Sequence, residues 1–190
     1  MKKLIATVAV FSAMITAAHA LSFQWNANSI KFDGSSLKSN NDVTGYLVYL
    51  GNKGSYSESY ALSESSTGAS VAASIGTVVD SKKGTSAMSK INSTFSFDYG
   101  SYVNDDVFGV LLTYTKEGTT YYNLSSSTYT LTGITSETSS PDTANLSFSF
   151  ADGGSASSVK SGGGWTAVPE PSTAALALAG LALLLKRRKA

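Results

Sequence analysis

Short segments in which apolar and polar residues alternate recur along most of the chain. Leu21, Phe23 and Trp25, for example, are separated by polar residues. Because successive side chains of a β-strand point to opposite faces, this period of two predicts strands with one apolar face. Turn-forming residues separate the segments at intervals of about ten residues. The predicted strands occupy residues 21–25, 43–50, 56–62, 71–79, 91–99, 107–115, 119–124, 127–131 and 146–150.

These segments predict an all-β fold. Strands with one apolar face need a second layer, so we expect an antiparallel β-sandwich or jelly-roll-like domain. Residues 107–115 are the most hydrophobic segment and are predicted to form a central strand. The short glycine-containing loop at 116–118 is expected to turn that strand back into residues 119–124 as a hairpin. A parallel β-solenoid is the alternative, but no fixed short repeat supports it.

The start of the chain has the three parts of a secretory signal peptide. Lys2 and Lys3 precede an apolar stretch, which ends at the small-residue sequence Ala18-His19-Ala20. Signal peptidase requires small side chains at the first and third positions before the cut, so Ala18 and Ala20 predict a mature chain that begins at Leu21. Residues 1–20 are therefore interpreted as a signal peptide read by the export machinery. An uncleaved anchor helix is the alternative.

The other end of the chain also carries a membrane signal. Pro169-Glu170-Pro171 is followed by an apolar run to residue 185 and then by Lys186, Arg187, Arg188 and Lys189. The prolines break any helix that enters from the preceding domain. The run is apolar on all faces, which predicts one short transmembrane helix. The four cations are expected to stop translocation and to remain cytoplasmic.

Residues 165–190 resemble the PEP-CTERM sorting domain. The resemblance rests on Val168-Pro169-Glu170-Pro171-Ser172-Thr173, the Ala/Leu/Gly helix and the closing basic cluster, in that order and at the end of the chain. It implies that the partner is exosortase, a membrane-embedded, cysteine-dependent, transpeptidase-like enzyme of Gram-negative bacteria. Cleavage is then expected at or near Pro169-Glu170-Pro171, followed by release or attachment at the cell surface. An unprocessed single-pass anchor is the competing interpretation.

The composition between the two signals excludes several function classes. Residues 21–168 contain eight lysines, no arginine and twelve acidic residues, a net charge of −4. Nucleic acid is therefore not an expected partner. Cysteine is absent, and the only histidine, His19, belongs to the signal peptide. The mature chain thus lacks the usual general base and the usual zinc ligands, and we expect no enzymatic activity, no cofactor and no metal. A glycosidase that uses two carboxylates is a less favoured alternative.

Residues 151–168 contrast with the strands because glycine and serine dominate them. This composition predicts a flexible linker. The expected organisation is therefore a signal peptide at 1–20, a β-sandwich-like extracellular domain at 21–150, a linker at 151–168 and the PEP-CTERM sorting signal at 169–190.

Two groups of residues are candidates for chemistry in the domain. Asn104, Asp105 and Asp106 could ligate calcium, but they supply few oxygens, and a turn stabilised by local hydrogen bonds is the favoured interpretation. The ten tyrosines offer ring faces on which sugar rings could stack. The competing interpretation is that they are ordinary strand residues that pack in or on the domain. In the pairs Tyr46/Tyr49 and Tyr121/Tyr122, alternation along the strand is expected to point one member outward. Tyr46, Tyr49, Tyr121 and Tyr122 are therefore the candidate glycan contacts.

The sequence thus predicts an exported protein of the cell surface, outer membrane or extracellular matrix, made as an inner-membrane-anchored precursor. Its domain is expected to have a structural or adhesive role. A carbohydrate-binding module that uses exposed tyrosines is the alternative, with extracellular polysaccharide as its partner.

Overall fold

The computed structural model describes residues 20–37, 42–84, 90–139, 141, 145–154 and 158–168. Strands dominate this part of the chain, with one short helix, which confirms the predicted all-β class. The elements in chain order are β1 (Ala20–Ala27), β2 (Lys31–Phe32), β3 (Ser35–Ser36), β4 (Val43–Asn52), β5 (Tyr60–Ala61), α1 (Gly68–Ile75), β6 (Thr77–Lys83), β7 (Ile91–Asp98), β8 (Asp106–Lys116), β9 (Thr119–Leu124), β10 (Tyr129–Thr130), β11 (Asn145–Phe148), β12 (Ser158–Val159) and β13 (Thr166–Ala167).

Two sheets contain most of the strands. The six-stranded sheet has the order β13-β9-β8-β4-β6, and β10 also pairs with β8. All of its pairs are antiparallel, and β8 lies between β4 and β9, as a central strand should. The three-stranded sheet has the order β11-β1-β7, in which β1 pairs antiparallel with β7 but parallel with β11. That parallel pair departs from the antiparallel arrangement expected throughout.

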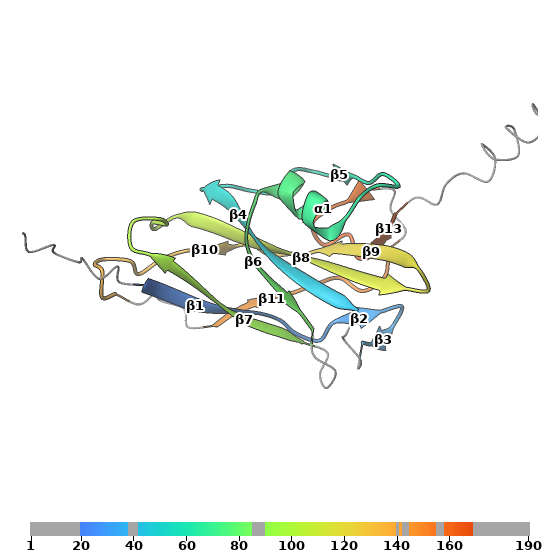
Figure 1. Cartoon of the computed structure of the whole chain (residues 1–190), viewed down its shortest axis with the longest axis horizontal. Helices are drawn as coiled ribbons and strands as arrows, with labels where there is room; N and C mark the ends of the chain where they lie inside the picture. The colour runs from blue at the N-terminus through green and yellow to red at the C-terminus, as the bar shows by residue number, and fades with distance from the viewer. Residues whose placement is uncertain are drawn as a thin grey trace, which may run out of the picture.

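The apolar faces of these two sheets share one core. Along β1, Leu21, Phe23 and Trp25 are buried and alternate with polar residues. The ring of Phe23 lies 5.4 Å from that of Phe108 on β8 and 5.5 Å from that of Phe95 on β7, measured between centroids. Edge-to-face contacts of this kind add to the stability that burial supplies. The large sheet is thus covered on this side by the small one (Figure 1).

The opposite face of the six-stranded sheet is also covered. Val48 and Leu111 from the sheet pack with Val71 of α1, Tyr60 of β5 and Val159 of β12 in a second core. In Figure 1, α1 and β5 lie above the large sheet and the three-stranded sheet lies below it. Because both faces are buried, β8 reads as a continuous apolar run instead of an alternating one. This burial agrees with the central strand predicted for residues 107–115.

Residues 71–79 were predicted as one strand, and this prediction is wrong for the first half of the segment. The chain forms α1 from Gly68 to Ile75, and only then β6. The Ser70 N–H donates to the Thr67 hydroxyl (3.1 Å) and the Thr67 N–H donates to the Ser70 hydroxyl (2.9 Å). This reciprocal cap satisfies two helix N-terminal donors and so starts the helix.

The prediction of a flexible linker over residues 151–168 is wrong for the described part of that segment. β12 pairs with β5, and β13 pairs with β9 at the edge of the large sheet. Gly162 and Gly164 have positive φ values of 64° and 77°, so they serve turns that few other residues adopt. The folded domain therefore continues past residue 150 to Val168.

Within the described part of the chain, no helix is long and apolar enough to cross a membrane. The predicted transmembrane helix at the C-terminus lies outside the described residues, as does the apolar stretch of the predicted signal peptide.

Candidate sorting site

The chain leaves the domain through β13. Thr166 and Ala167 pair with Tyr122 and Tyr121 of β9, and the Val168 N–H donates to the carbonyl oxygen of Thr120 at 3.1 Å. Backbone hydrogen bonds of the sheet therefore hold the chain up to residue 168. The predicted motif Pro169-Glu170-Pro171 begins at the next residue.

Trp165 fixes the position of this last strand. Its side chain is 3% exposed, and its indole N–H donates to the carbonyl oxygen of Lys31 at 2.6 Å. Its ring packs against Phe32, at 5.7 Å between centroids, and against Tyr114, at 6.0 Å. The glycine- and serine-rich composition of residues 151–168 does not predict this role for Trp165. A lone tryptophan in a glycine-rich segment was the available signal, because so large an apolar side chain is seldom left in a solvated linker.

The predicted processing residues lie mostly outside the described part of the chain. This holds for Pro169, Glu170 and Pro171, for Lys186, Arg187, Arg188 and Lys189, and for Ala18. Ala20 is described: it is exposed, it opens β1, and it pairs with Asp98. The start of β1 and the end of β13 lie at opposite ends of the molecule (Figure 1). The two predicted processing points are thus attached to different ends of the domain.

The four candidate glycan-contact tyrosines do not form one surface. Tyr46 and Tyr122 pack in the second core, whereas Tyr49 and Tyr121 pack against the first core. None of the four is exposed. The expectation that one member of each pair points into solvent is wrong, because α1 and the small sheet cover both faces of the large sheet.

Hydrogen bonds explain why these phenols tolerate burial. The Tyr122 hydroxyl donates to the carbonyl oxygen of Ser66 at 2.9 Å, and the Tyr49 hydroxyl donates to Asp106 Oδ1 at 3.1 Å. Burial raises the pKa of Tyr122 above its ordinary value. Burial, followed by the hydrogen bond to Asp106, raises the pKa of Tyr49.

Asn104, Asp105 and Asp106 form a hydrogen-bonded turn. The Asp106 carboxylate is 2% exposed and accepts from the Val103 N–H (2.8 Å) as well as from Tyr49. Asn104 exchanges two hydrogen bonds with the backbone of Ile134, at 2.9 and 3.0 Å. These contacts agree with the interpretation of a turn. Among the described residues, no group of three acidic, histidine or cysteine side chains could hold a metal ion.

A family model matches the end of the chain, and its description is the PEP-CTERM protein-sorting motif, over residues 167–189. No curated protein and no solved structure matches the chain. The family match confirms the resemblance seen in the sequence, and its first residue, Ala167, lies in β13. The motif implies export as a membrane-anchored precursor that exosortase processes for the cell surface. Residues 167–189 of this chain are therefore a PEP-CTERM protein-sorting motif that begins inside the last strand of the domain.

Proposed function

We propose that this protein is a non-catalytic structural or adhesive component of the cell surface or extracellular matrix, which exosortase cleaves at or near Pro169-Glu170-Pro171. The single observation that carries the proposal is the sorting motif at residues 167–189. Export begins with the signal peptide at residues 1–20, and the basic cluster Lys186 to Lys189 holds the inner end of the precursor's membrane helix until cleavage.

The attachment of the motif to the fold supports this order of events. Trp165, Thr166 and Val168 are tied to the domain by burial or hydrogen bonds, and Pro169 follows directly. A cut within Pro169-Glu170-Pro171 therefore leaves every described strand in the product. The processed domain keeps its fold and can serve at the surface without its membrane helix.

The packing of the domain supports a structural role. Asp106, the most buried carboxylate among the described residues, accepts hydrogen bonds from its own turn and from Tyr49, so its oxygens are already used. The tyrosines named above contribute to the two cores, which favours packing over a stacked tyrosine platform for sugar rings. A tyrosine-based carbohydrate module and a glycosidase are therefore less favoured than a structural role.

Replacing Glu170 tests the processing step. Glu170→Ala changes neither the signal peptide nor the membrane helix, so export and anchoring should continue while recognition fails. The variant should accumulate in the membrane as a longer form, and the parent should appear as a shorter species at the surface or in the medium. Mass spectrometry of the C-terminal peptide measures the difference. Glu58→Ala, at an exposed glutamate of the domain, is the matched control and should be processed like the parent.

Changing Lys186 to Lys189 into serines should have a different effect. The short helix then has no charge to hold its inner end, and it should slip through the bilayer. A parent protein that retains Ala190 in its mature surface form would contradict processing and would leave a plain single-pass anchor.

A further inference from the structure

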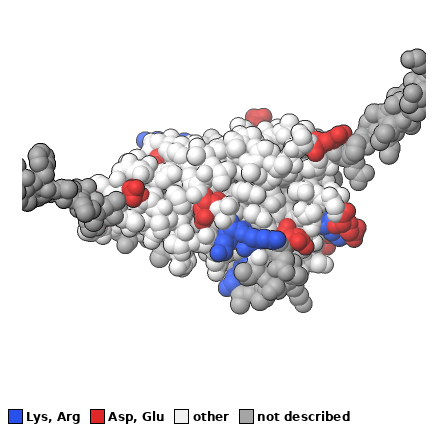
Figure 2. Space-filling view, in the orientation of Figure 1, with Lys and Arg blue, Asp and Glu red and all other residues white. Residues whose placement is uncertain are grey.

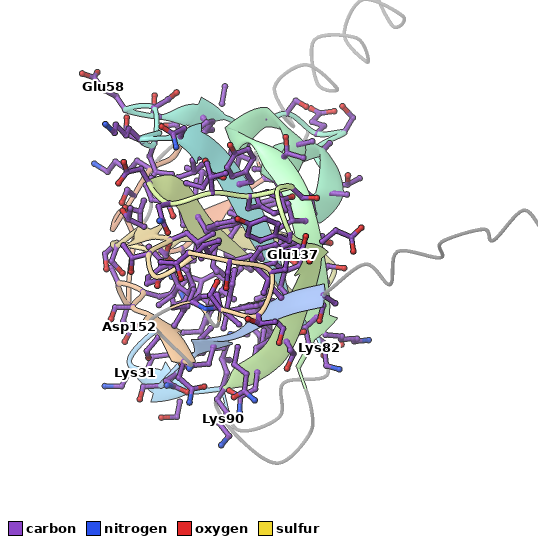
Figure 3. The ribbon with its side chains drawn as sticks, turned by 90° about the vertical axis from the view of Figure 1, so that its left-hand side faces the viewer. Lys31, Glu58, Lys82, Lys90, Glu137 and Asp152 are labelled. Carbon is purple, nitrogen blue, oxygen red and sulfur yellow. The ribbon has the colours of Figure 1, made fainter. Side chains whose placement is uncertain are left out.

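Three lysines surround a small hollow where β6 ends and β7 begins. The hollow has a volume of about 90 Å³ and is lined by Lys82, Lys83, Gly84, Lys90, Ile91 and Asn92. By this measure a single water needs roughly 10–15 Å³, so the hollow has room for a group the size of a carboxylate. Lys82 and Lys90 project outward from the lower part of the molecule in Figure 3, so the site is an open basic rim and not a closed cavity.

The charge of this rim is not neutralised by neighbouring side chains. Among the described residues, none of the three lysines forms a salt bridge. The acid on the same strand, Asp80, accepts the Trp25 indole N–H at 2.7 Å and the Ser81 N–H at 2.8 Å. Lysine side chains gather at the lower edge of the molecule in Figure 2, although residues 21–168 carry a net charge of −4. An anion at this rim would therefore meet three lysines that form no salt bridge with another described residue, although Figure 2 also shows acidic side chains beside them.

Protection of a sheet edge is the simpler explanation for two of these lysines. β6 is the edge strand of the large sheet, and lysines there prevent pairing with another chain. This explanation does not extend to Lys90, which precedes β7 in the other sheet. It also leaves unexplained the surface that adjoins the rim.

That surface is the outer face of the β11-β1-β7 sheet. It is polar, and its one charged side chain is Asp98, at the end of β7 away from the rim. In the strand register, Gln24 pairs with Thr94 and Asn145, and Asn26 pairs with Asn92 and Ser147. Asn92 belongs both to this face and to the lining of the hollow. The amide and hydroxyl side chains that face outward here are Ser22, Gln24, Asn26, Asn92, Thr94, Ser96, Asn145 and Ser147.

We propose that the lysine rim and this polar face together bind an acidic polysaccharide, with uronate carboxylates at Lys82, Lys83 and Lys90 and sugar hydroxyls on the amide and hydroxyl face. Amides donate and accept hydrogen bonds, as sugar hydroxyls require. A phosphate backbone calls for cations along its length, but the polar face has none. This proposal adds a ligand to the proposed role at the cell surface. It does not depend on whether exosortase processes the tail.

The first test compares two triple variants that change the net charge equally. The full chain, purified in mild detergent, is titrated with oligogalacturonate as the acidic probe and with dextran as the neutral one. Lys82→Ser/Lys83→Ser/Lys90→Ser should weaken oligogalacturonate binding about tenfold, the effect expected of three exposed ion pairs together. Lys53→Ser/Lys116→Ser/Lys160→Ser should bind like the parent. Equal losses in the two variants would show a response to net charge alone and would overturn the proposal.

The second test removes the polar contribution without changing charge. Gln24→Ala/Asn92→Ala should weaken oligogalacturonate binding severalfold while a thermal unfolding curve remains that of the parent, since both side chains are exposed. Phosphatidylglycerol vesicles and a DNA duplex are the competing anions. Binding of either one as tight as that of oligogalacturonate, or no saturable binding of oligogalacturonate, would refute the acidic-glycan site.

Discussion

Tyr56 shows how one residue connects a loop to the large sheet. Its hydroxyl lies 2.6 Å from the Ser125 hydroxyl, which also accepts from the Val110 N–H at 3.2 Å. Its ring lies over Gly109, where a Cβ atom would collide with the phenol. Burial raises the pKa of Tyr56 to about 12, although its hydrogen bond with Ser125 opposes the shift. The folded state therefore holds Tyr56 as a neutral phenol.

This shift predicts a loss of stability in alkali. An unfolded tyrosine titrates near pH 10, so between about pH 10 and about pH 12 the unfolded state loses its proton while the folded state keeps it. The contribution of Tyr56 is complete below pH 10 and falls as pH rises through this window. Tyr56→Phe should lower the free energy of unfolding by about 1 kcal/mol at pH 7 and should make the alkaline decline shallower.

Urea unfolding at a series of pH values measures both effects. Tyr99→Phe is the control, because it removes the same hydroxyl from a tyrosine that is 44% exposed. An alkaline decline as steep in Tyr56→Phe as in the parent would show that Tyr56 titrates no differently when folded.

At the scale of elements, β8 is the strand on which both cores depend. Val110 packs in the core between the two sheets, and Leu111 packs in the core beneath α1. Both side chains are fully buried. Adjacent residues of a strand face opposite sides, so each of the two positions reports on a different core.

Aspartate at either position should therefore be costly. Val110→Asp and Leu111→Asp each bury an unpaired carboxylate, and each should lower the free energy of unfolding by about 3 kcal/mol or more. Val78→Asp is the matched control, because Val78 lies on edge strand β6 and is 37% exposed. Chemical denaturation of the three variants measures the difference. If Val110→Asp and Leu111→Asp unfolded at the denaturant concentration of Val78→Asp, the central placement of β8 would be refuted.

The elements that the sequence predicts well are those with a strong local pattern. β1, β4 and β7 alternate or run apolar over many residues, and the β8–β9 hairpin has a short glycine turn. The helix α1 was missed because its cap is Thr67 with Ser70, whereas the usual sequence signal has Glu or Gln at the later position. Apolar side chains at 71, 75 and 78–79 then fitted a strand as well as a helix.

The sorting motif could be predicted from the sequence because a processing enzyme reads a linear signal. Its attachment to the fold could not, because β13 and β12 each have two residues and are defined by partners far away in the chain. Glycine content indicated flexibility, whereas Gly162 and Gly164 shape turns that return the chain to the sheet. The basic rim could not be predicted either, because it depends on contacts between strands of different sheets. Lys90 lies beside Lys82 and Lys83 only because the fold places the start of β7 next to the end of β6.

At the scale of the whole molecule, the segment after residue 150 closes the domain. A chain that ends at Val168 should unfold at the temperature of the parent domain, whereas one that ends at Phe150 loses Val159 and Trp165 from the two cores. Removal of a buried tryptophan alone costs about 3–5 kcal/mol, which is much of the stability of a typical domain. The shorter chain should therefore be largely unfolded by circular dichroism. Equal melting temperatures would restore the interpretation of this segment as a linker.

The same attachment limits where the precursor can be cut. Proteolysis concentrates where the backbone is not held by burial and hydrogen bonds, and the sheet holds the chain through the Val168 N–H. The mature protein should therefore end at Val168 or later within the motif, and its last peptide should contain Trp165. In Trp165→Ala the strand loses its anchor, local opening becomes more frequent, and ends before residue 165 should appear. Mass spectrometry of the surface form decides the matter, because a parent protein that ends before Trp165 would show that β13 opens before it is processed.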